Sequence, residues 1–129
     1  MEDWELDMVV DVCRRGDGGD AIEDLRCAVT PADLDGLVDL YFGFGDDWVA
    51  KCCMVQLVQD QSSPILTGVW RDMLRVPELP ERCDLAPMAL AVALCALDGD
   101  ASPEAFMRYF EDRELARAEA RRRLAGGPG

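Results

Sequence analysis

The chain contains no histidine and no asparagine. Without histidine it lacks the usual general base, the usual partner of a serine or cysteine nucleophile, and the commonest metal ligand. It also has no P-loop, dinucleotide-binding or nucleophile-elbow motif. Neighbouring carboxylates at residues 46–47 and 98–100 do not match the ligand spacing of a calcium loop. We therefore expect a protein that is not an enzyme and that uses no metal or cofactor.

Positive charge is scarce. The 129 residues include 13 basic side chains, of which one is lysine, against 26 acidic ones, so the formal net charge is −13. Residues 1–60 hold 15 acidic and four basic side chains, whereas residues 61–129 hold 11 acidic and nine basic ones. Affinity for nucleic-acid phosphates comes from lysine and arginine, so we do not expect direct binding to nucleic acid. The acidic N-terminal half would instead attract a cationic partner.

Long apolar runs are also absent. The longest covers residues 85–97 and includes Pro87. As a helix it would span about 20 Å, which is shorter than the hydrocarbon core of a bilayer. It therefore predicts a buried helix and no membrane span. The first residues are acidic and show no secretory signal, so we expect a cytoplasmic protein.

Six cysteines lie at positions 13, 27, 52, 53, 83 and 95, and the only close pair is adjacent. No CxxC motif is present, and zinc would lack histidine partners. Cys13, Cys52, Cys53 and Cys95 lie within apolar helical patterns. We predict free thiols that pack as small hydrophobic side chains, without a redox role.

Apolar residues recur at helical spacing, and no segment shows the alternation of a strand. Helix starts are indicated where a capping hydroxyl precedes proline, at Thr30, Ser63 and Ser102. The pattern predicts an all-α fold of about seven helices, near residues 5–15, 20–29, 31–42, 47–58, 64–76, 85–97 and 103–125. Short connections imply antiparallel neighbours in a single domain over residues 1–125, with a flexible tail at 126–129.

Several details of these helices can be tested. Glycines at positions 16, 18 and 19 should end the first helix, and prolines at positions 77 and 80 should end the fifth helix. Asp84 should cap the start of the sixth helix. The third should bury one apolar face, formed by Leu34, Leu37, Val38, Tyr41 and Phe42. The fourth is apolar on most sides and should be central. Trp70 should pack in the core, and Glu119 and Arg123 are spaced for an ion pair.

Residues 30–75 have a helical-repeat pattern. An apolar helix is followed by an acidic turn at Asp46 and Asp47, then by Val49 and Lys51, and then by a second helix. This segment resembles a HEAT-type helical repeat, with lysine where that pattern usually has arginine. The resemblance implies a protein-binding scaffold built as a short HEAT-like helical array. A compact irregular bundle of helices is the alternative.

The densest acidic group lies close to this segment. The candidate partner-binding residues are Asp33, Asp35, Asp39, Asp46, Asp47 and Trp48. Asp33 falls in a helix first turn, and Asp46 or Asp47 is expected to act as a cap. Asp35 and Asp39 are four residues apart, so they repel each other on a helix and are the strongest candidates. Alternatively, these carboxylates form a solvated face that keeps the protein soluble.

These observations favour a non-enzymatic protein–protein interaction module. In its sharper form, the chain is an acidic inhibitor or immunity-type protein that masks a basic surface on a partner protein. One alternative is a structural subunit of a homo-oligomer or larger complex, in which another copy covers the apolar run at residues 85–97. Another is an acidic mimic of nucleic acid. The sequence leaves the oligomeric state open.

Overall fold

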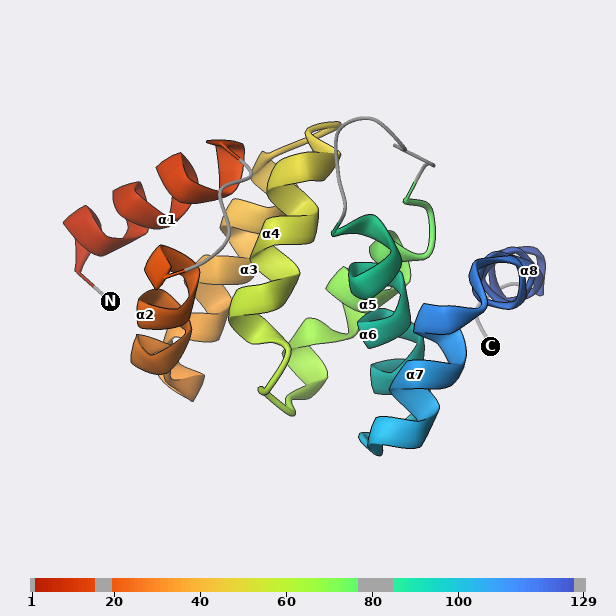
Figure 1. Ribbon diagram of the computed structural model, residues 1–129. Helices are drawn as coiled ribbons and strands as arrows, with labels where there is room; N and C mark the ends of the chain where they lie inside the picture. The colour runs from red at the N-terminus through yellow and green to blue at the C-terminus, as the bar shows by residue number, and fades with distance from the viewer. Residues whose placement is uncertain (1, 16–19, 77–84, 127–129) are drawn as a thin grey trace.

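The computed structural model describes residues 2–15, 20–76 and 85–126, which form helices and no strand (Figure 1). In chain order the elements are α1 (Asp3–Arg15), α2 (Asp20–Ala28), the 3₁₀ helix η1 (Pro31–Asp33), α3 (Leu34–Gly43), α4 (Trp48–Val58), the 3₁₀ helix η2 (Pro64–Leu66), α5 (Thr67–Met73), α6 (Ala86–Asp98), α7 (Pro103–Glu111) and α8 (Arg113–Ala125). The all-α prediction is confirmed. The described residues contain eight α-helices, however, instead of about seven.

The additional helix results from a break at Asp112. This residue has φ −110° and ψ 90°, which lies outside the helical region. Its carboxylate accepts a hydrogen bond from the amide of Leu115 at 3.0 Å. Asp112 therefore ends α7 and caps α8. The prediction of one continuous helix over residues 103–125 is wrong.

The predicted helix starts are made by local side-chain caps. Asp47 accepts a hydrogen bond from the amide of Ala50 at 3.1 Å, and Ser102 accepts one from the amide of Ala105 at 3.2 Å. Ser63 caps the 3₁₀ turn that leads into α5, by accepting from the amide of Ile65 at 3.4 Å. The predicted features at glycines 16, 18 and 19, at prolines 77 and 80, at Asp84 and at 127–129 lie outside the described residues.

Helix α4 lies in the middle of the molecule, as predicted. In Figure 1, α1 and α2 lie on one side of it, α3 lies behind it, and α5 and α6 lie on the other side. Eight of its 11 residues are buried. Trp70 is also in the core, and Cys13, Cys52, Cys53 and Cys95 are buried and form no disulfide, which confirms their predicted packing.

Helix α6 joins two hydrophobic clusters. Ala89, Val92 and Ala93 belong to the larger cluster around α4, and Leu90 and Leu94 belong to a smaller cluster with α7 and α8. Residue 86 and residues 89–95 are buried by other helices of the same chain. The apolar run is thus buried as predicted, and its covering does not require another copy. None of the described helices is both long and apolar enough to cross a membrane.

Candidate protein-binding surface

The six candidate residues lie on consecutive elements, from η1 through α3 to the first residue of α4. Two of the carboxylates take part in local hydrogen bonds. Asp33 accepts from the amide of Thr30 at 2.8 Å and from its hydroxyl at 3.0 Å. Asp47 caps α4. Both carboxylates are therefore engaged in starting helices, which is the structural role that the sequence indicated for such positions.

Trp48 is half-buried against two cations of its own chain. The ammonium nitrogen of Lys51 lies 4.5 Å from the centroid of the indole, and the guanidinium carbon of Arg75 lies 5.9 Å from it. Both distances fall within the range of cation–π attraction. The structure thus assigns Trp48 intramolecular contacts, in addition to the partial exposure that was expected of it.

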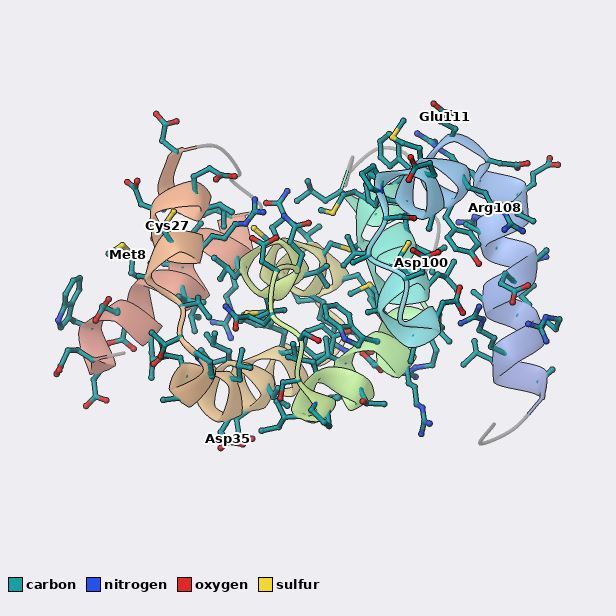
Figure 2. All side chains as sticks on the ribbon, turned by 90° about the horizontal axis from the view of Figure 1, so that it is seen from below. Met8, Cys27, Asp35, Asp100, Arg108 and Glu111 are labelled. Atoms are coloured by element: carbon teal, nitrogen blue, oxygen red, sulfur yellow. The ribbon has the colours of Figure 1, made fainter. Side chains whose placement is uncertain are left out.

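The remaining three carboxylates, Asp35, Asp39 and Asp46, are exposed. Within the described part of the chain, none of them forms an ion pair. Asp35 and Asp39 lie on the outer face of α3, and Asp46 lies in the turn that follows this helix. Figure 2 shows Asp35 pointing away from the body of the molecule. These three side chains are therefore available to a cation from outside.

Phe42 lies on the same face of α3 and was placed wrongly by the sequence. It was predicted on the buried stripe with Leu37 and Tyr41, but 47% of its surface is exposed. Residues 35, 39 and 42 have the i, i+4, i+7 spacing of one helix face. The ring of Phe42 lies over Gly68 of α5, where a Cβ atom would be 3.7 Å from its Cζ. We call Asp35, Asp39 and Phe42 the α3 surface.

A second exposed apolar side chain lies on a neighbouring element. Helix α3 packs beside η2 and α5, and the three elements form one edge of the molecule in Figure 2. Ile65 of η2 is 38% exposed. The α3 surface therefore combines an exposed aromatic ring with two exposed carboxylates, next to a further apolar side chain.

Beneath this surface is a buried polar group that we call the Lys51–Asp72 cluster, formed by Tyr41, Trp48, Lys51, Asp72 and Arg75. One carboxylate oxygen of Asp72 accepts hydrogen bonds from the Tyr41 hydroxyl at 2.8 Å and from the Lys51 ammonium at 2.9 Å. The other oxygen accepts from Nε of Arg75 at 3.1 Å and also from Nη2 of Arg75. The cluster connects α3, α4 and the end of α5.

The electrostatics of the cluster follow from this geometry. Burial alone would raise the pKa of Asp72, but the hydrogen bonds from Arg75, Lys51 and Tyr41 outweigh it, so the pKa lies below its usual value. Burial, followed by the bond to Asp72, raises the pKa of Tyr41. Lys51 is 3% exposed and Tyr41 is fully buried. The Asp72 carboxylate is thus satisfied by two buried donors and by the exposed Arg75, and the hydrogen bonds join three helices.

An open groove of about 1400 Å³ lies between the α4–α5 connection and the C-terminal helices. Residues 59–64 and α5 line one wall, α6 forms part of its lining, and residues 97–103 with the end of α8 line the other wall. Arg26, Arg71, Arg122 and Arg123 line it together with Asp60, Asp98 and Asp100. The groove was not predicted, because its walls are far apart along the chain.

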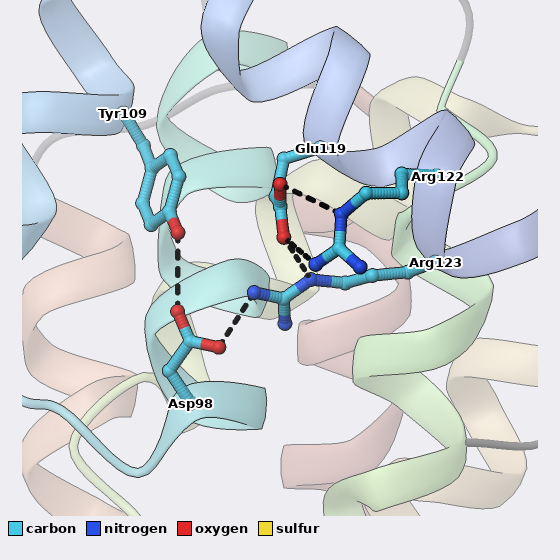
Figure 3. A network of polar contacts seen from close by, with 5 residues as sticks. All are labelled: Asp98, Tyr109, Glu119, Arg122 and Arg123. Carbon is cyan, nitrogen blue, oxygen red and sulfur yellow. Dashed lines mark hydrogen bonds and ion pairs between the residues drawn. The ribbon is translucent and has the colours of Figure 1, made fainter. Parts of the chain in front are cut away.

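A network of side chains at one end of this groove fixes α8 (Figure 3). Asp98 at the end of α6 accepts a hydrogen bond from the Tyr109 hydroxyl at 3.1 Å and pairs with Arg123 at 2.6 Å. Glu119 pairs with Arg123 at 3.0 Å, as the spacing predicted, and also with Arg122. Hydrogen bonds from Arg122 and then Arg123 lower the pKa of Glu119 to about 2.

We expect the two ion pairs of Glu119, both within α8, to be lost in strong acid. Because the pKa of Glu119 falls from 4.5 to about 2 in the folded chain, its ion pairs contribute fully above pH 4.5 and are lost as the pH falls toward 2. A carboxyl titration followed by NMR should give a Glu119 midpoint near pH 2. In Arg122→Ala the midpoint should rise toward 4.5, because the hydrogen bond that lowers the pKa most is gone. A wild-type midpoint near 4.5 would contradict the ion pairs.

Within residues 2–15, 20–76 and 85–126, no three or more cysteine or carboxylate side chains are arranged to hold a metal ion. Compared with known proteins, the chain matches no family model, no curated protein and no solved structure.

Proposed function

We propose that this chain is a non-enzymatic protein-binding module whose α3 surface binds a basic segment of a partner protein. In its sharper form it is an acidic inhibitor or immunity-type protein that masks a cationic surface. The observation that carries the proposal is the placement of two exposed carboxylates, Asp35 and Asp39, beside the exposed ring of Phe42.

The physical argument has a short-range part and a long-range part. Asp35 and Asp39 are like charges four residues apart, and their repulsion destabilises the helix slightly. A pair of cations on a partner protein would turn this repulsion into attraction. Phe42 offers an aromatic side chain of the kind that dominates interface energetics. At longer range, the excess of acidic residues in the first 60 positions attracts a basic partner and accelerates its encounter.

We further propose that the helices form a short HEAT-like array with antiparallel neighbours. Several pairs of consecutive helices pack on one another, namely α3 with α4, α5 with α6, α6 with α7 and α7 with α8, while α4 also packs on α1, α2 and α6. The residues that carry the resemblance, Asp47, Val49 and Lys51, lie at the start of α4. In such an array the exposed face of one helix can serve as the binding surface while its neighbours supply the core.

Charge reversal tests the binding surface. As a probe we would use a synthetic amphipathic helix with lysines four residues apart beside a leucine, and measure its dissociation constant by fluorescence anisotropy. The double variant Asp35→Lys/Asp39→Lys should weaken binding by at least about tenfold, since two attractive contacts become repulsive. Phe42→Ala should weaken it as well, while leaving the salt dependence unchanged.

The matched control is Asp20→Lys/Asp24→Lys on α2, which reverses two exposed carboxylates with the same spacing and the same change in net charge. This variant should weaken binding by less than about threefold, because dissolved salt screens the attraction between the probe and charges that lie away from the α3 surface. Equal losses in the two double variants would show attraction by net charge alone and would overturn the proposal. Displacement of a native partner by duplex DNA would favour the nucleic-acid mimic instead.

A further inference from the structure

Two buried cysteines from distant parts of the sequence meet between α1 and α4. Cys13 lies near the end of α1 and Cys53 lies in the middle of α4, and neither side chain is exposed. Their thiols are in hydrogen-bond contact. This contact was not foreseen, because the sequence analysis considered each cysteine separately as a small hydrophobic side chain.

Helix α1 is attached to the molecule by a narrow stripe. Its buried residues are Val9, Val12 and Cys13, and it packs mainly on α4. Its other face is open, with Trp4 63% exposed and Met8 39% exposed. A helix with so few buried side chains belongs to the part of a protein that opens locally at low free-energy cost. Opening of α1 would uncover both thiols.

We propose that Cys13 and Cys53 are a modification site at which hydrogen peroxide forms a disulfide that fastens α1 to α4. When α1 opens, the Cys13 thiolate attacks one oxygen of the peroxide, giving a sulfenic acid and releasing hydroxide. When α1 closes again, the Cys53 sulfur displaces the sulfenic oxygen, which leaves as water with the thiol proton. Two thiols and one peroxide thus yield one disulfide and two waters, and the peroxide is reduced.

The closed protein protects the pair from faster oxidation. The hydrogen bond to Cys53 and then burial raise the pKa of the Cys13 thiol, so little of the reactive thiolate is present while α1 is docked. The reaction rate should therefore follow the opening of α1. We expect low, non-denaturing concentrations of urea to accelerate it, and we expect the exposed Cys27 to react with peroxide first.

Cys52 is the only neighbouring competitor along the chain, and helix geometry disfavours it. Consecutive Cα atoms are about 3.8 Å apart, whereas disulfides need Cα atoms roughly 4.4–6.8 Å apart. Side chains at adjacent helical positions also point about 100° apart. A disulfide between Cys52 and Cys53 would therefore require α4 to unwind at its buried centre.

The test treats the full-length chain with hydrogen peroxide, alkylates the remaining thiols and maps tryptic peptides by mass spectrometry. We expect a peptide ending at Arg14 joined to the peptide of residues 52–71, with fragment ions assigning the bond to Cys53. The link should persist in Cys52→Ser and disappear in Cys53→Ser. Amide exchange in α1 should slow at least about tenfold on oxidation and recover with dithiothreitol.

Three results would overturn the proposal. These are a link that survives in Cys53→Ser, a bond assigned to Cys52 in the wild-type chain, and peroxide oxidation of Cys13 to the sulfonic acid without any link. The fragment-ion assignment is made on wild-type protein, so the test stands even if a serine at either buried position prevents folding.

Discussion

Replacing Asp72 with alanine should lower the free energy of unfolding by about 3–5 kcal/mol. The carboxylate of Asp72 is 8% exposed and is bonded to the ammonium of Lys51, which is 4% exposed. Its removal leaves a buried cation without a counter-charge and a buried Tyr41 hydroxyl without an acceptor. Urea unfolding followed by circular dichroism measures the change.

Two further variants separate this effect from a general change in charge. Asp39→Ala removes an exposed carboxylate and should change the free energy of unfolding by less than about 0.5 kcal/mol. Adding Lys51→Met to Asp72→Ala should recover at least about half of the loss, because the unpaired buried charge is then gone. A loss below about 1 kcal/mol in Asp72→Ala would mean that the pair behaves as a surface salt bridge.

The same contact makes a prediction about pH. Since the pKa of Asp72 is lowered in the folded chain, its contribution is present above the ordinary value of 3.8 and is lost as the pH falls below it. The difference in stability between the wild type and Asp72→Ala should therefore be constant near neutral pH and shrink in acid.

Much of the fold could be predicted because helix starts are local. Ser102 and Asp47 bond amides three residues away, so a short window of sequence contains both partners of each cap. Asp112 carries the same signal three residues before Leu115. It was missed because the apolar pattern on one side and the charged pattern on the other were taken as one helix.

The Lys51–Asp72 cluster could not be predicted, because its partners are 21 and 31 residues apart along the chain. One signal was nevertheless available. The chain's only lysine lies in a segment that is apolar on most sides, and a buried lysine requires a carboxylate partner. The sequence alone could not say which of the 26 acidic residues would supply it.

The exposed side chains of the α3 surface differ from the set that the sequence predicted. Phe42 was assigned to the buried stripe because it follows Val38 at a four-residue spacing, although it lies about 100° around the helix from Tyr41. At that angle it falls beside Asp35 and Asp39. Trp48, which was expected to contact a partner, stacks against Lys51 and Arg75. The exposed aromatic side chain of the α3 surface is therefore a different residue from the predicted one.

Leu94→Ala should lower the free energy of unfolding by about 2–5 kcal/mol, the usual cost of a cavity at a buried leucine. Leu94 is fully buried in the smaller hydrophobic cluster, with Tyr109, Ala116 and Ala120. All three tryptophans precede α6 in the sequence, and Trp70 lies in the larger cluster. Tryptophan fluorescence therefore reports on the part of the core that does not contain the substitution.

Because α6 contributes side chains to both clusters, neither can lose it and remain packed. Fluorescence and circular dichroism should consequently give one coincident unfolding transition, shifted to lower denaturant in Leu94→Ala by the same amount with both probes. Matched behaviour would support a single domain over residues 1–125. If circular dichroism instead showed an early transition while the fluorescence midpoint stayed unchanged, the chain would consist of two units, on either side of α6, that fold separately. Stacked repeats can behave in this way when the interface between them is weak.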